Sequence, residues 1–108
     1  MYTPSKHVNT FHIAGFQHYE GAFVLDQLKP GTKLRIEAEP DNPYDPNAMA
    51  LYLDSNMLGH IPKGEGGLMS LMHYYGHTDV FEAVVVQVNP EADPWKQVRV
   101  GIYITDNR

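Results

Sequence analysis

The polar segment of residues 39–48 holds side chains that are suited to binding a ligand. Asn42, Tyr44 and Asp45 lie between prolines, which fix the backbone φ angle and favour extended neighbours. The Asp45 carboxylate can accept a hydrogen bond from a ligand hydroxyl, and the Tyr44 ring offers a flat face for a base or sugar. The same residue types also staple tight turns through bonds to nearby backbone, which is the commoner role. Both interpretations stay open at this point.

A second candidate site follows at residues 59–63, where a strand end carries His60 and Lys63 follows three residues later. Glycine N–H groups beside a lysine, with a helix beginning near Gly66, could hold a phosphate. The alternative is a half-buried strand histidine and a solvated lysine, because these glycines match no known phosphate-loop pattern. The pattern therefore indicates anion binding only as a hypothesis.

Two histidines at helical spacing, His73 and His77, raise the question of a metal site. Zinc binding needs both rings on one face and a further ligand, and no His-Glu-x-x-His pattern is present. Gly76 is expected to end the helix before His77, and no serine lies in a Gly-x-Ser-x-Gly turn. We therefore predict a protein that is not an enzyme and has no cofactor, with a metal-dependent hydrolase as a remaining alternative.

The elements that must position these residues are mostly short strands. Alternating apolar residues predict strands near residues 10–16, 34–38, 48–53, 57–61, 80–89 and 97–105. A helix is predicted over residues 68–75, with Leu68, Leu71, Met72 and Tyr75 on its buried face. A single helical turn or an irregular segment is expected in residues 22–28, and residues 1–9 are expected to form a loosely ordered tail. Six strands joined by short connections predict a mostly β fold, a small antiparallel barrel or sandwich with one or two short helices.

Composition limits the functional classes further. A chain of 108 residues suits one domain, expected over residues 10–106, and a net charge of −5 argues against an unspecific clamp on a nucleic-acid backbone. No cysteine is present, so disulfides and thiolate metal sites are excluded. Neither a leader peptide nor a bilayer-spanning apolar stretch is evident. We expect a soluble cytoplasmic protein with no membrane partner.

Three segments in a fixed order resemble the HIRAN domain family. They are Ala-Gly-Phe-Gln-His-Tyr at residues 14–19, Glu-Pro-Asp-Asn-Pro-Tyr-Asp-Pro-Asn-Ala at 39–48 and Leu-Gly-His-Ile-Pro-Lys at 58–63. The resemblance covers about residues 10–104, and the central motif is fairly specific. It implies a six-stranded barrel related to OB and SH3-like folds, and membership among the small stand-alone bacterial proteins of the family.

The resemblance also implies a function, because the best-understood members bind the free 3′-hydroxyl end of single-stranded DNA. By similarity Asp45 would receive the terminal hydroxyl, Tyr44 would stack on the terminal nucleotide, and Asn42 would shape the pocket. His60 and Lys63 would meet phosphates. A helicase or nuclease partner is also implied, since the domain is found fused to helicases and fork-remodelling enzymes.

The first of these segments departs from the family pattern. End-binding members carry an Arg-Tyr pair where this chain has Gln17 and His18 before Tyr19. Gln17 cannot replace a cation, whereas His18 or Tyr19 could still stack on a base. Lower affinity or a different ligand is therefore expected. The alternative function is a protein interaction adaptor, in which Tyr19, Tyr44 and Trp95 dock a partner chain.

Overall fold

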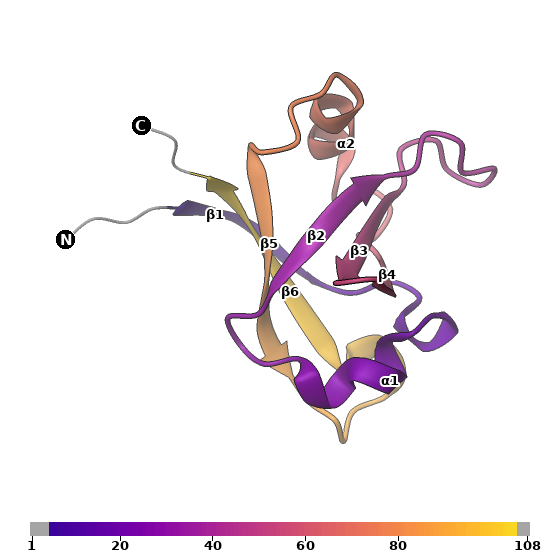
Figure 1. The fold of residues 1–108 in the computed structure, drawn as a ribbon, viewed down its shortest axis with the longest axis vertical. Helices are drawn as coiled ribbons and strands as arrows, with labels where there is room; N and C mark the ends of the chain where they lie inside the picture. The colour runs from indigo at the N-terminus through magenta and orange to yellow at the C-terminus, as the bar shows by residue number, and fades with distance from the viewer. Residues whose placement is uncertain (1–4, 106–108) are drawn as a thin grey trace.

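The computed structural model describes residues 5–105, whose six strands form one curled antiparallel sheet (Figure 1). The spatial order of the strands is β1-β6-β5-β2-β3-β4. Their bounds are Ser5–His12 (β1), Lys33–Ala38 (β2), Met49–Leu53 (β3), Asn56–His60 (β4), Phe81–Val88 (β5) and Val98–Thr105 (β6). This half-barrel confirms the predicted mostly β class with six antiparallel strands and short helices.

The core fills the inside of the curl. In β6, Val98, Val100 and Ile102 are fully buried, while Arg99 between the first two is exposed. This alternation is the period of two that a strand with one covered face requires. The core also includes residues from β3, β4 and β5, among them Met49, Leu51, Leu58, Ala83 and Val85.

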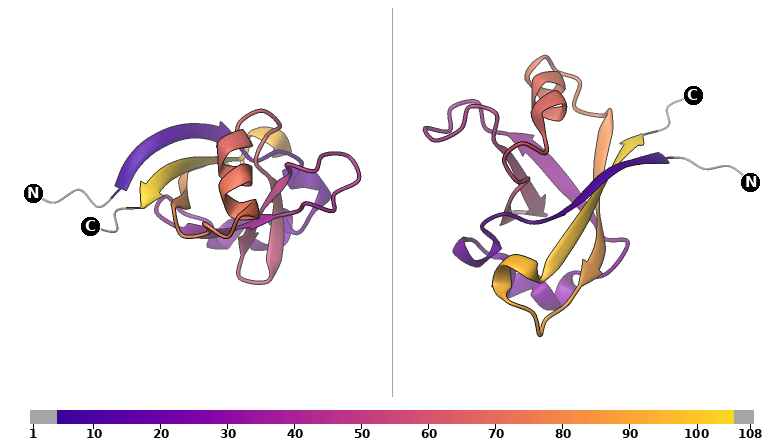
Figure 2. Two further views of the ribbon diagram at one scale, coloured as in Figure 1. Left: turned by 90° about the horizontal axis from the view of Figure 1, so that it is seen from above. Right: turned by 180° about the vertical axis from the view of Figure 1, so that it is seen from behind.

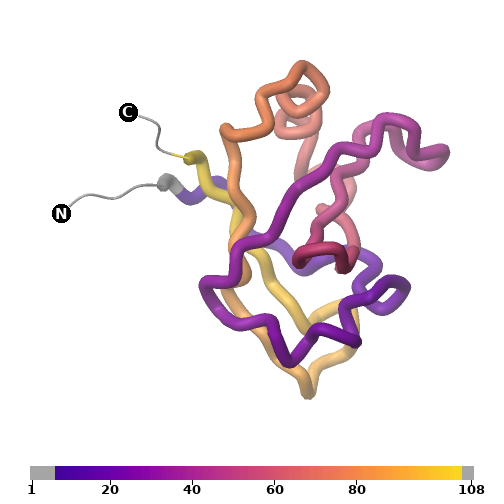
Figure 3. Tube along the Cα trace, in the orientation of Figure 1, coloured from indigo at the N-terminus to yellow at the C-terminus, as the bar shows by residue number. Residues whose placement is uncertain are grey.

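Helices lie at the two ends of the half-barrel (Figures 1 and 2). Helix α2 (Gly67–Tyr74) lies at one end, and the view from above places it over the curl of the sheet. At the other end, α1 (Gly21–Val24) continues into the 3₁₀ turn η2 (Leu25–Gln27), as the sequence predicted. Two further 3₁₀ turns are η1 (Phe16–His18) and η3 (Pro94–Lys96). The Cα trace shows the loop of residues 39–48 projecting from the body between β2 and β3 (Figure 3).

One seam of the half-barrel is closed by the chain that follows β1. Ala14 and His60 exchange two backbone hydrogen bonds, N–H to O distances of 2.8 and 2.9 Å, which link this segment to β4. Gly59 permits the contact: its φ is +146°, and an added Cβ would lie 2.4 Å from the Ala14 carbonyl oxygen. Only glycine fits a backbone approach this close.

The opposite seam, between β2 and β5, is open over half its length. These strands pair only at Lys33–Val84 and Leu34–Ala83. Beyond Leu34 the two strands diverge, and α2 lies at the end where they separate (Figure 1). The sheet is therefore closed on one side and split on the other.

The expected tail of residues 1–9 is wrong for residues 5–9, which belong to β1. Residues 1–4 lie outside the described part of the chain. Strand β1 begins at Ser5 and pairs with β6 from Ser5–Thr105 to His12–Arg99, with a bulge between His7 and Asn9. Backbone pairing with β6, rather than burial of side chains, orders this edge segment, so its sequence lacks the apolar alternation used to find strands.

The predicted buried face of α2 is also wrong, although the helix itself is confirmed. Met69, Ser70 and His73 are buried, whereas Leu68, Leu71 and Tyr75 are 67%, 55% and 69% exposed. Helix α2 carries leucine or methionine on more than one side, so apolar spacing alone does not fix which side faces the sheet. Packing against the end of the sheet selects the side that contains Met69.

Candidate nucleic-acid interface

The loop of residues 39–48 is held by bonds from its own side chains. Asn42 Oδ1 accepts the backbone N–H groups of Tyr44 and Asp45 at 2.9 and 3.1 Å. Asp45 Oδ1 accepts the N–H of Asn47 at 2.9 Å. Asn42 and Asp45 therefore do staple the turn. Asp45 nevertheless keeps its second oxygen, Oδ2, without a hydrogen-bond donor among residues 5–105.

Glu39 connects the loop to β4. His60 donates from Nε2 to Glu39 Oε1 at 2.6 Å, and Asn42 donates from Nδ2 to the same oxygen at 3.3 Å. The His60 and Glu39 side chains are only 19% and 30% exposed, so this junction is partly shielded from water. Glu39 is not among the site residues that the sequence motifs predict. It lies 21 residues before His60, and only the adjacency of β2, β3 and β4 brings the two together.

The first sequence segment reaches the same place through Tyr19. The Tyr19 and His60 rings meet edge to face, with centroids 5.5 Å apart and planes at 67°. Quadrupole interactions favour this arrangement of aromatic rings. Gln17 and His18, in contrast, are exposed on η1 and do not line the two cavities beside the 39–48 loop.

Six of the eight predicted site residues line one open cavity of about 350 Å³. These are Tyr19, Asn42, Tyr44, Asp45, His60 and Lys63, with Ala14, Ala48 and Ile61 as further lining. Tyr44 is 91% exposed, so its ring stands at the rim. A nucleoside-sized ligand suits a cleft of this volume.

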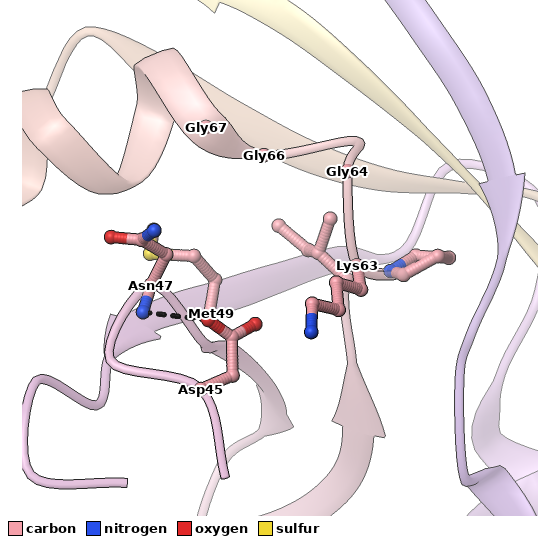
Figure 4. Close-up of a pocket in the computed structure, with 9 residues that line it drawn as sticks. Asp45, Asn47, Met49, Lys63, Gly64, Gly66 and Gly67 are labelled. Atoms are coloured by element: carbon pink, nitrogen blue, oxygen red, sulfur yellow. Dashed lines mark hydrogen bonds between the residues drawn. The ribbon is translucent and has the colours of Figure 1, made fainter.

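A second cavity of about 260 Å³ adjoins the first, with which it shares Asp45, Ile61 and Lys63. Figure 4 shows the Asp45 carboxylate and the Lys63 amine on facing walls, with the start of α2 at Gly66 and Gly67 beyond. A carboxylate acceptor and an ammonium donor therefore face one space. Such a pair can contact a hydroxyl and a phosphate of one ligand.

The alternative prediction of a metal site requires His73 and His77 to lie close together. His73 is buried in α2, and this burial lowers the pKa of its imidazole below the ordinary value of 6.5. His77 is exposed after the helix end. Within residues 5–105 no group of three or more histidine, aspartate or glutamate side chains is placed to hold a metal ion.

Comparison with known proteins places this chain in a family. The sequence model of the HIRAN domain family matches residues 7–105, so the chain belongs to this family. HIRAN domains are DNA-binding modules rather than catalytic domains. A search of curated protein sequences gives no match.

Two solved structures share the fold. A crystal structure of a protein from Lactobacillus plantarum has a TM-score of 0.76 and 19% sequence identity, covering 95% of this chain and 97% of the other. The HIRAN domain of human HLTF has a TM-score of 0.65 and 18% identity, covering 96% of this chain and 82% of the other.

The described residues contain no helix that is long and apolar enough to span a membrane.

Proposed function

We propose that this domain binds the 3′-hydroxyl end of single-stranded DNA in the cavity between the 39–48 loop and β4. The observation that carries the proposal is the convergence of Tyr19, Tyr44, Asp45 and Lys63 on one cavity from three separate segments. Membership of a DNA-binding family supports it. No residue has a catalytic role in this function, so the domain acts as a recognition module.

Asp45 provides the selection for an end. Its Oδ1 is held by the Asn47 N–H, which orients the carboxylate and leaves Oδ2 to accept the terminal hydroxyl. An internal nucleotide carries a phosphate at that position, and this phosphate would be repelled by the carboxylate. Rejection of the wrong ligand by a like charge is an effective source of specificity.

Tyr44 and Tyr19 provide affinity that does not depend on base identity. Stacking on an aromatic ring contributes about 1–3 kcal/mol per base. Tyr44 stands at the rim and Tyr19 lies against His60, so the two rings flank the cavity from the loop and from the residue that follows η1. Lys63 pairs with the phosphate that precedes the terminal nucleoside, and His60 contacts the same region of the strand.

Gln17 and His18 have a peripheral role in this scheme. Both are exposed outside the cavity, so they meet the strand only beyond its terminal nucleotide. The net charge of −5 adds no general attraction for DNA. A partner such as a helicase or nuclease would therefore present the strand end to the domain.

The experiment compares fluorescein-labelled oligonucleotides that differ only in a 3′-hydroxyl or a 3′-phosphate, by fluorescence anisotropy at fixed low salt. We expect the hydroxyl end to bind more tightly to the wild type. Asp45→Asn keeps an oxygen for the Asn47 N–H but removes the charge, so the preference should fall about tenfold or more while the melting temperature stays unchanged. Equal affinity of the wild type for both ends would refute end recognition.

A further inference from the structure

The open half of β2 leaves backbone groups without a pairing strand. Pairing with β5 stops at Leu34, and no residue in the range 5–105 pairs with Ile36 or Ala38 on that side. Most backbone N–H and C=O groups in proteins are hydrogen-bonded to another group or to water. This stretch is therefore a short free strand edge inside the fold.

The direction of those groups follows from the alternation along the strand. In an antiparallel sheet, successive residues direct their hydrogen-bonding groups to opposite neighbours. Thr32 accepts a bond from Val85 on the β5 side, whereas Glu39 donates to Ala48, which precedes β3. Even-numbered residues of β2 therefore face the β5 side, and the N–H and C=O groups of Ile36 and Ala38 face the opening.

A groove of about 430 Å³ borders this edge and provides space for a ligand. It is lined by Arg35, Ile36, Glu37, Ala38, His73 and Thr78. Arg35 pairs with Glu37 at 2.9 Å, so the two charged side chains of the groove compensate each other. On its α2 side, the Nε2 atom of the buried His73 ring has no hydrogen-bond partner among the described residues.

We propose that this groove binds an extended peptide segment without charge at its centre, which adds as a strand along Ile36–Ala38. The alternating N–H and C=O groups of the edge define the occupant, because only another extended main chain presents donors and acceptors at the same spacing. Strand addition of this kind takes its affinity from main-chain bonds and its selectivity from alternate side chains. The compensated charges favour a segment without charge at its centre.

Amide hydrogen exchange followed by NMR tests the free edge directly. In the protein alone, the Arg35 and Glu37 amides should exchange slowly, since they face β3, while the Ile36 and Ala38 amides exchange faster. The probe is a synthetic peptide that copies residues 81–88, the strand that already pairs with the first half of β2, with two lysines added at each end for solubility. It should slow exchange at Ile36 and Ala38.

A matched peptide with proline at alternate positions lacks the required N–H groups and should leave both amides unchanged. If Ile36 and Ala38 are already protected in the dilute monomer, or if the copied peptide leaves them unprotected, the proposal is wrong. Protection that rises with protein concentration in the absence of peptide would assign the edge to a second copy of this chain and also overturn it.

The variant Ala38→Pro removes one N–H that faces the groove and none that pairs with β3. It should weaken peptide binding about tenfold with a small change in melting temperature, because one main-chain bond is lost. Unchanged affinity would contradict the assigned register. Asp45→Asn should bind the peptide like the wild type, so failure of the DNA proposal and failure of this one are distinguishable.

Discussion

The two seams of the half-barrel differ in how far their backbone groups are paired. At the β1–β4 seam, Ala14 and His60 bond directly, and Tyr19, Glu39 and the 39–48 loop gather around the junction. At the β2–β5 seam, pairing stops after two residue pairs and a groove remains. Both seams therefore create a concave surface, one by closing the sheet and the other by leaving it open.

The difference shows what each surface can recognise. The closed seam satisfies its backbone groups internally, so its cavity presents side chains: a carboxylate, an amine and aromatic rings. The open seam leaves backbone groups unpaired, and these match another backbone. Natural proteins usually protect such edges, and here the shortness of the edge and the nearby α2 limit uncontrolled pairing.

Gly59→Ala should have the largest effect because it acts where the closed seam is tightest. The new Cβ would meet the Ala14 oxygen, at a backbone φ of +146° that alanine rarely adopts. Steric conflict and backbone strain together should lower the free energy of unfolding by about 3 kcal/mol. Urea denaturation followed by circular dichroism measures this change, and DNA binding should weaken with it.

Gly31→Ala is the matched control for that prediction. Gly31 also has a positive φ, +98°, but an added Cβ would meet no atom within 4 Å. The variant should lose only the free energy of unfolding that corresponds to the left-handed backbone penalty of alanine, about 1–2 kcal/mol. Equal losses for the two variants would mean that the close contact with Ala14 contributes nothing.

Two side-chain pairs, one at each seam, provide the next test. His60 and Glu39 are partly buried at the closed seam, whereas Arg35 and Glu37 are about half exposed at the open seam. A double-mutant cycle to alanine should give a coupling energy of about 1–2 kcal/mol for the first pair and below about 0.5 kcal/mol for the second. Both cycles use urea unfolding at pH 7. Similar couplings would remove the energetic distinction between the seams.

The sequence predicted the strands best where burial required alternation. Residues 34–38 and 97–105 alternate apolar and polar side chains, and all of them except Gln97 lie in strands β2 and β6. It failed at Ser5–Asn9, where pairing with β6 replaces burial, and at the orientation of α2. Tertiary contacts that the local pattern does not encode decided both cases.

The candidate site could be predicted to a similar extent. Motif order identified the residues of the cavity, because loop chemistry and strand ends are visible in the sequence. Glu39 was missed, since its partner His60 lies on a strand two places away in the sheet. The open edge of β2 was also invisible, because the same alternating pattern suits a strand paired on one side or on both.

His73 gives the smallest expected effect and tests whether the open seam is incompletely packed. Burial lowers the pKa of its imidazole below 6.5, so the unfolded chain binds more protons as the pH falls through 6.5. Stability should therefore decrease on acidification. Replacing His73 by leucine removes this proton linkage and also removes the unpaired Nε2 atom. At pH 7.5 the free energy of unfolding of the variant should therefore equal that of the wild type or exceed it by up to about 1 kcal/mol.

The measurement compares wild type and His73→Leu by urea unfolding at pH 7.5 and pH 5.5. Arg35 and Glu37, which line the same groove, are present in both proteins. His12, whose pKa is lowered by burial and by the nearby Arg99 and Lys96, is also common to both. The variant should therefore lose less stability than the wild type on acidification. An identical loss would show that His73 is accommodated equally well in either protonation state, and that the packing between α2 and β2 is not the weak point of this seam.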